Sequence, residues 1–160
     1  MARWMMVLGL VVLAACSSLD VTRDLPPKMQ GDLQVTGVRV RTTPDADVPG
    51  DVLPRLQVGI QDALKNKPAG KAKVHLDVVV TSYRTTGFKV RTTLGMLAGP
   101  NGLAASVTVL DDNEVPIGTF DIVGRETPKA QGLTFYSQMQ AVIEEASAKV
   151  VEALYGAPAD

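Results

Sequence analysis

The chain has 160 residues, and its 16 lysines and arginines nearly balance its 17 aspartates and glutamates. This length supports one compact domain with a substantial core and is too short to predict two. We expect no nucleic-acid partner, because no basic stretch is interleaved with aromatic residues that could stack on bases.

The first residues have the layout of a secretory signal peptide. Arg3 is followed by an apolar run, residues 4–13, and then by small residues up to Ala15. At about 1.5 Å per residue this run covers roughly 15 Å, about half of a bilayer core, so we do not expect a transmembrane helix here. We predict that residues 1–15 are removed.

The four residues Leu13-Ala14-Ala15-Cys16 resemble the lipobox of bacterial lipoproteins. The resemblance implies that the thiol of Cys16, the only cysteine of the chain, carries a diacylglyceryl group and becomes the new N-terminus. Two or three acyl chains hold a protein on a membrane, because each buried methylene contributes about 0.8 kcal/mol. Ser17, in place of aspartate, implies the periplasmic face of the outer membrane, with the inner membrane as the alternative. The competing interpretation is an ordinary secreted protein.

Residues 16–32 are predicted to form the lipidated cysteine and a tether. The segment is polar, contains Pro26-Pro27 and shows no sustained period. An extended tether would hold the domain clear of the lipid headgroups. The alternative is an extension packed on the domain, with Leu25 and Met29 docked.

The next three elements are predicted from hydrophobic periodicity. Residues 33–43 alternate valines with arginines, which indicates a half-buried strand. Residues 52–66 carry apolar positions at helical spacing, with Asp51 placed as the N-cap. Residues 73–83 show the clearest alternation of apolar and polar residues and predict a second strand.

Two further strands and a long helix follow. Residues 104–110 and 115–124 flank an acidic turn, and the apolar parity of the second strand switches at Gly118, which predicts a bulge. Residues 134–155 keep one apolar stripe over about five turns and predict a helix that stops at Gly156.

Together these elements predict a single α+β domain over residues 33–156 with a short tail, 157–160. We expect a mainly antiparallel sheet of about four strands with two helices packed on one face, in the order β-α-β-β-β-α. This order is similar to that of small envelope lipoproteins of Gram-negative bacteria, such as auxiliary lipoproteins of lipid-transport systems and the periplasmic domain of the curli secretion lipoprotein.

The segment 85–103 is the candidate for partner binding. It is rich in glycine, yet it also holds large apolar side chains that an ordinary solvent loop seldom carries: Phe88, Leu94, Met96 and Leu97. One interpretation is that it docks onto a partner protein or a lipid surface. The other is that residues 90–96 fold back on the domain as an edge strand or a cover, and the sequence leaves both open.

The sequence offers little catalytic chemistry. His75 and Asp77 lie two residues apart on one predicted strand and so share a face, but no nucleophile motif accompanies them. One histidine and one lipid-bearing cysteine make no recognisable metal ligand set. We therefore predict a protein that is not an enzyme and has no cofactor and no metal.

These observations predict a membrane-anchored periplasmic lipoprotein that serves as a non-catalytic accessory or interaction subunit of an envelope assembly or transport system, with an envelope protein as its partner. The alternative function is a small module that binds a lipid or amphiphile between the sheet and its helices. An enclosed apolar cavity would favour this alternative.

Overall fold

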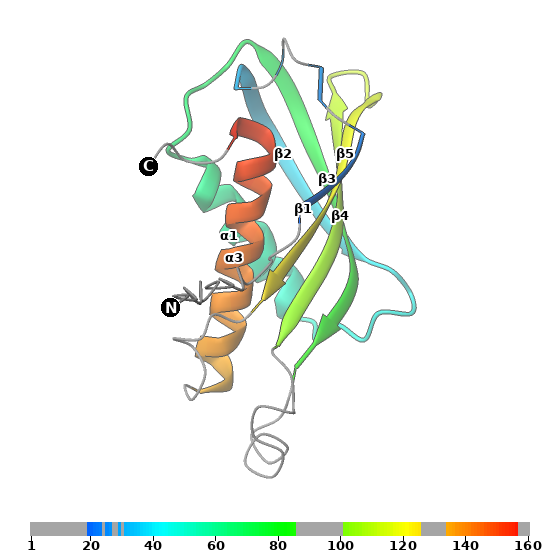
Figure 1. The fold of residues 1–160 in the computed structure, drawn as a ribbon, viewed down its shortest axis with the longest axis vertical. Helices are drawn as coiled ribbons and strands as arrows, with labels where there is room; N and C mark the ends of the chain where they lie inside the picture. The colour runs from blue at the N-terminus through cyan, green and yellow to red at the C-terminus, as the bar shows by residue number, and fades with distance from the viewer. Residues whose placement is uncertain are drawn as a thin grey trace, which may run out of the picture.

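The structure is a computed structural model that describes residues 19–23, 25–26, 29, 31–85, 101–125 and 134–156. Two helices cover one face of a single sheet (Figure 1), which confirms the predicted α+β class. The elements in chain order are β1 (Leu19–Arg23), β2 (Leu33–Thr42), α1 (Val52–Leu64), β3 (Ala72–Arg84), β4 (Gly102–Asp111), β5 (Pro116–Arg125) and α3 (Phe135–Tyr155).

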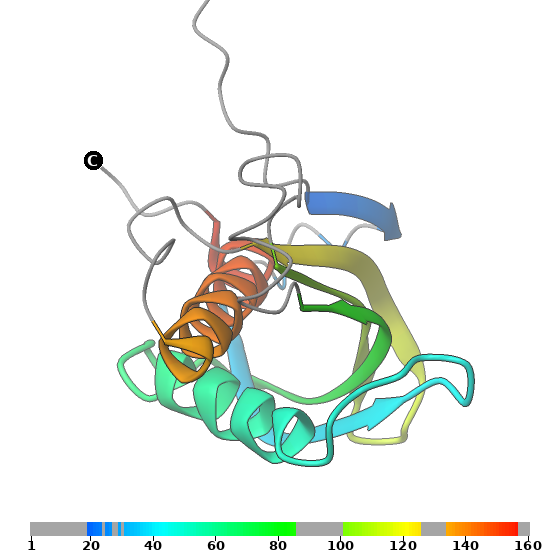
Figure 2. The same cartoon turned by 90° about the horizontal axis from the view of Figure 1, so that it is seen from below.

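The sheet has the strand order β1-β5-β4-β3-β2. Strands β2 and β3 are parallel and are connected through α1, whereas every other neighbouring pair is antiparallel. Figure 2 shows the sheet curving around one side of the molecule while α1 and α3 close the other side. One face of the sheet therefore packs on α1 and α3, and no other helix of the described residues covers the opposite face.

The N-terminal segment corrects the predicted tether. Residues 19–23 form β1, which pairs with β5 and adds a fifth strand to the predicted four. Leu25 is 5% exposed and belongs to the core, and Met29 packs against it. The tether prediction is wrong for these residues, and the packed extension is what the structure has. The physical reason is that β1 satisfies the backbone groups that the edge of β5 would otherwise leave unpaired.

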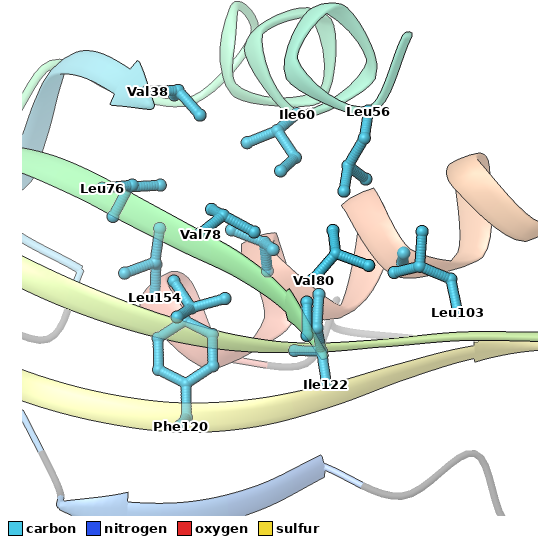
Figure 3. Close-up of a cluster of buried hydrophobic side chains, with 14 of the residues drawn as sticks. Val38, Leu56, Ile60, Leu76, Val78, Val80, Leu103, Phe120, Ile122 and Leu154 are labelled. Atoms are coloured by element: carbon cyan, nitrogen blue, oxygen red, sulfur yellow. The ribbon is translucent and has the colours of Figure 1, made fainter. Parts of the chain in front are cut away.

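The core lies between the inner face of the sheet and the two helices (Figure 3). Alternate residues of each strand and one stripe of each helix point into it, as the periodicity predicted. The side chains at 0% exposure are Leu33, Val52, Leu56, Ile60, Val74, Val78, Val80, Val107, Val109, Ile122, Ala146, Val150 and Leu154.

Two glycines let the layers approach closely. A Cβ atom on Gly124 of β5 would lie 2.5 Å from the carbonyl oxygen of Val142 in α3. A Cβ atom on Gly59 of α1 would lie 2.9 Å from side-chain atoms of Ile143 and Ser147. The absence of side chains at these positions sets the spacing of α3 to both the sheet and α1.

The predicted bulge and helix ends have mixed outcomes. Val109 pairs with Gly118 and the next residue of β4 pairs with Pro116, so one residue of β5 is extra beside Gly118, as predicted. Thr134 caps α3 by accepting a hydrogen bond from the Ser137 backbone nitrogen. Asp51 precedes α1 but its side chain makes no cap hydrogen bond, because its carboxylate faces Arg55 at 3.4 Å instead.

Candidate functional site

The face of the sheet opposite α1 and α3, called the outer face below, is left open by the described helices. On its central strand three small side chains, Ala104, Ser106 and Thr108, alternate with the buried residues of β4, and the larger Leu110 follows them on the same face. Charged residues flank this strip on the neighbouring strands. An antiparallel sheet with one open face either meets solvent there or is covered by a partner.

One ion pair organises the β2 side of the outer face. Arg41 donates from Nε to Asp77 Oδ1 at 3.1 Å and from a terminal nitrogen to Oδ2 at 2.7 Å. The Asp77 side chain is 17% exposed and that of Arg41 is 59% exposed. The hydrogen bond from Arg41 holds the pKa of Asp77 below its ordinary value, with Arg39 adding a smaller effect of the same sign. Asp77 is therefore a fixed anionic group at neutral pH.

His75 is held by a bulge in β2. Val35 pairs with Val74 and Gly37 pairs with His75, so Thr36 is extra. Thr36 Oγ1 donates to the Val74 carbonyl at 3.1 Å and shares a second hydrogen bond of 3.3 Å with His75 Nδ1.

Gly37 makes room for this arrangement. A Cβ atom at Gly37 would lie 2.9 Å from His75 Nδ1. The imidazole can therefore lie against β2 only because this position has no side chain. Gly37 is therefore needed here for the space that it leaves to the His75 ring, and not for a backbone turn.

A shallow pocket of about 250 Å³ opens beside His75. Its polar lining comes from Arg39, His75, Asp77 and Glu114, and its apolar lining includes Leu110. Ligand pockets for drug-sized molecules run from about 300 to 1,000 Å³, so this one has the size of a single partner side chain. Its mixed charges favour a polar group over an acyl chain.

The outer face does not assemble a catalytic dyad from the two residues that the sequence placed together. Asp77 binds Arg41, and His75 binds Thr36. Within the described ranges no group of three or more His, Cys, Asp or Glu residues could hold a metal ion. The described helices include none that is long and apolar enough to cross a membrane.

A second polar cluster lies at the end of the sheet where β3 and β5 stop and β4 begins. Asn101 donates to Gln138 at 3.0 Å, and both side chains are buried. Arg55 lies 4.6 Å from the ring centroid of Tyr136 and donates to its hydroxyl at 2.7 Å. These contacts fix the first turns of both helices to the sheet and to each other.

Several predicted functional residues lie outside the described residues: Cys16, Phe88, Leu94, Met96 and Leu97. The sequence analysis missed the Arg41 ion pair and the Thr36 bulge. A signal for the bulge exists, because the inward apolar positions of β2 pass from odd numbers, Leu33 and Val35, to even numbers at Val38.

No protein-family model matches the chain, and no curated protein matches it. Solved structures of PelC are similar to this chain in fold. The PelC dodecamer from Paraburkholderia phytofirmans has a TM-score of 0.57 and 14% sequence identity, covering 88% of this chain and 99% of the PelC chain. A dodecamer of a single-substitution variant of that PelC has a TM-score of 0.50 and 16% identity over the same shares of both chains. At these identities the likeness is one of fold alone.

Proposed function

We propose that this protein is a bacterial envelope lipoprotein, anchored by lipid on Cys16 at the periplasmic face of the outer membrane, that acts as a non-catalytic interaction subunit. The lipobox supports the anchor. The open outer face supports the binding role, and it is the observation on which that role rests: a surface with a fixed ion pair and a pocket lined by charged side chains is left uncovered by the described elements.

The filled core argues against the alternative of a lipid-binding module. A cavity large enough for a water molecule would give its lining side chains accessible surface, yet core residues from β3, α1 and α3 such as Val78, Ile60 and Val150 are at 0% exposure. Where the described core residues meet, they leave no room for an acyl chain. The pocket on the outer face is lined by charged as well as apolar side chains, which suits a protein side chain.

We infer that further copies of this chain are among its partners. The PelC chain that is similar in fold forms a dodecamer. In the present chain the two edges of the sheet are different strands, β1 and β2, so copies that meet through unlike surfaces can close into a ring. The small side chains of β4 would let a second copy of the chain approach the outer face closely.

Lipidation is tested by metabolic labelling with a fatty acid and by the intact mass of the purified protein. The wild type is expected to incorporate the label, to lack residues 1–15 and to carry acyl mass on Cys16. Cys16→Ser is expected to remain an unlabelled, uncleaved precursor. Labelling that persists in Cys16→Ser would contradict the anchor.

Self-association is tested by sedimentation of the lipidated protein in detergent. Ser106→Arg places a long charged side chain in the middle of the outer face and is expected to abolish assembly. Gln61→Arg adds the same side chain at an exposed position of α1 and serves as the matched control. A wild type that sediments as a monomer, or a Ser106→Arg variant that assembles equally well, would contradict this role of the outer face.

A further inference from the structure

The anchor and the sheet are joined by very little chain. Cys16 precedes Leu19, the first residue of β1, by three positions. At about 3.3–3.6 Å per residue, Cys16 lies within roughly 11 Å of Leu19. A lipid on Cys16 would therefore hold the sheet directly beside the bilayer, and the remaining question is which part of the domain faces the lipid.

The strand register gives the direction. Leu19 pairs with Ile122 and β1 runs antiparallel to β5, so the chain that precedes Leu19 leaves in the direction in which β5 runs from Ile122 to Arg125. Arg125 is the last residue of β5. The anchor is thus attached toward the end of the sheet where β5 and β3 stop and β4 begins, called the lower end below (Figure 1).

Two arginines stand side by side at the lower end. Gly102 of β4 pairs with Arg84 of β3 on one side and with Arg125 of β5 on the other. Residues in one row of a sheet point to the same face, and Leu103 and Gly124 beside them point inward, so both arginines lie on the outer face. Both are exposed, and two strand spacings of about 4.8 Å separate their backbones by roughly 10 Å. Gly102 leaves the space between them open.

The charge at this end is divided between the two edges of the sheet. The connection that follows β2, at the edge opposite β1, carries the exposed acids Asp45, Asp47 and Asp51. Anionic headgroups would attract the arginine side and repel the acidic side. The β1–β5 edge of the sheet would therefore lie closer to the membrane than the β2 edge.

We propose that the lower end of the sheet is a membrane-contact surface on which Arg84 and Arg125 bind the phosphate groups of an anionic phospholipid bilayer. The proposal rests on the proposed lipid anchor at Cys16 and adds the orientation of the domain. It leaves Thr108 and the pocket beside His75, which lie toward the opposite end of the sheet, away from the bilayer, where a protein partner can reach them.

The orientation can be measured in vesicles with the lipidated full-length protein. The vesicles contain phosphatidylglycerol and a phospholipid with a nitroxide on its headgroup. Because the thiol of Cys16 would be alkylated, Ala104→Cys near the lower end and Asp112→Cys at the opposite end each introduce a single free thiol for a fluorophore. Strong quenching is expected at position 104 and little at position 112. Equal quenching at both positions, or stronger quenching at 112, would overturn the proposal.

The arginines are tested by adding Arg84→Gln and Arg125→Gln to the Ala104→Cys protein. Each cation near an anionic surface contributes about fivefold in binding, so the double variant should weaken the membrane-facing orientation by about twenty-fivefold. Lys73→Gln removes an exposed cation at the start of β3, the end of the strand opposite Arg84, so it is the matched control and should keep the quenching. Quenching unchanged in the double variant would overturn the proposal.

The intact mass of the same protein sample distinguishes a failure of the lipid anchor at Cys16 from a failure of the proposed orientation. If the sample carries no acyl mass, the anchor at Cys16 is wrong and the orientation falls with it. If the acyl mass is present and the quenching pattern is reversed, the anchor stands and only the orientation is wrong.

Discussion

The two faces of the sheet are built from the same strands yet obey different constraints. On the inner face, alternate residues of β3, β4 and β5 are apolar and fully buried, and Gly124 brings α3 into close contact. On the outer face, the intervening residues are only partly buried and include polar side chains beside the apolar Val79, Leu110 and Val123. One ion pair and one histidine contact order its β2 side. The comparison teaches that stability is concentrated on one face, so the other face can be changed with little effect on folding.

Ile122 and Val123 give the sharpest test of this division, because they are neighbours on β5 that point to opposite faces. Ile122 is at 0% exposure, and Ile122→Ala is expected to lower the free energy of unfolding by about 2–5 kcal/mol through a cavity in the core. Val123→Ala should cost much less. Denaturant titration of both variants measures the difference, and similar losses would show that the outer face is also packed.

Two glycines in adjacent strands extend the comparison to backbone spacing. A Cβ atom at Gly124 would collide with the backbone of α3, so Gly124→Ala is expected to cost about 1–3 kcal/mol by forcing the helix from the sheet. At Gly102 of the outer face the nearest atom lies at 3.4 Å, and Gly102→Ala should be nearly neutral. The melting temperatures of the two variants check this order, and a larger loss for Gly102→Ala would contradict it.

The smallest expected effect concerns the ion pair of the outer face. Asp77→Asn removes the charge that binds Arg41 and is expected to cost at most about 1 kcal/mol at neutral pH, because the pair is partly exposed. Asp121→Asn, an exposed aspartate of the same face, is the control.

The pH dependence of that effect has a definite sign. The pKa of Asp77 is lowered in the folded protein by its hydrogen bond with Arg41. The charged carboxylate therefore stabilises the fold above the unfolded pKa of about 3.9, and this contribution disappears as the pH falls through the lower folded pKa. The difference in unfolding free energy between wild type and Asp77→Asn should shrink to zero in acid. A difference that grows in acid would contradict this account.

Most of the fold could be predicted from periodicity, because local alternation reports burial directly. The strand predicted at residues 73–83 is observed as Ala72–Arg84, and the helix predicted at 134–155 is observed as Phe135–Tyr155. Strand β1 could not be predicted in this way. It has five residues, and its partner lies roughly a hundred residues further along the chain.

The outer-face contacts could be predicted only in part, since they depend on the register between strands. Arg39 is the direct neighbour of Asp77 across β2 and β3, yet the carboxylate binds Arg41, whose own neighbour is Val79. The sequence shows that arginines and Asp77 share a face. It does not show which arginine binds the Asp77 carboxylate, because the twist of the sheet and the bulge at Thr36 determine which guanidinium group lies closer.

The pairing of the first strand with the last has a consequence for the order of folding. A chain is synthesised from its N-terminus, so residues 19–23 exist long before β5 does, and the edge that they complete is made last. Until β5 is made, residues 19–23 have no strand of their own molecule with which to pair. A newly formed β5 has an unpaired edge, which can bind any extended segment nearby. Closing the sheet is therefore a late, long-range step. A nascent chain halted before residue 116 would lack β5, the strand with which residues 19–23 pair.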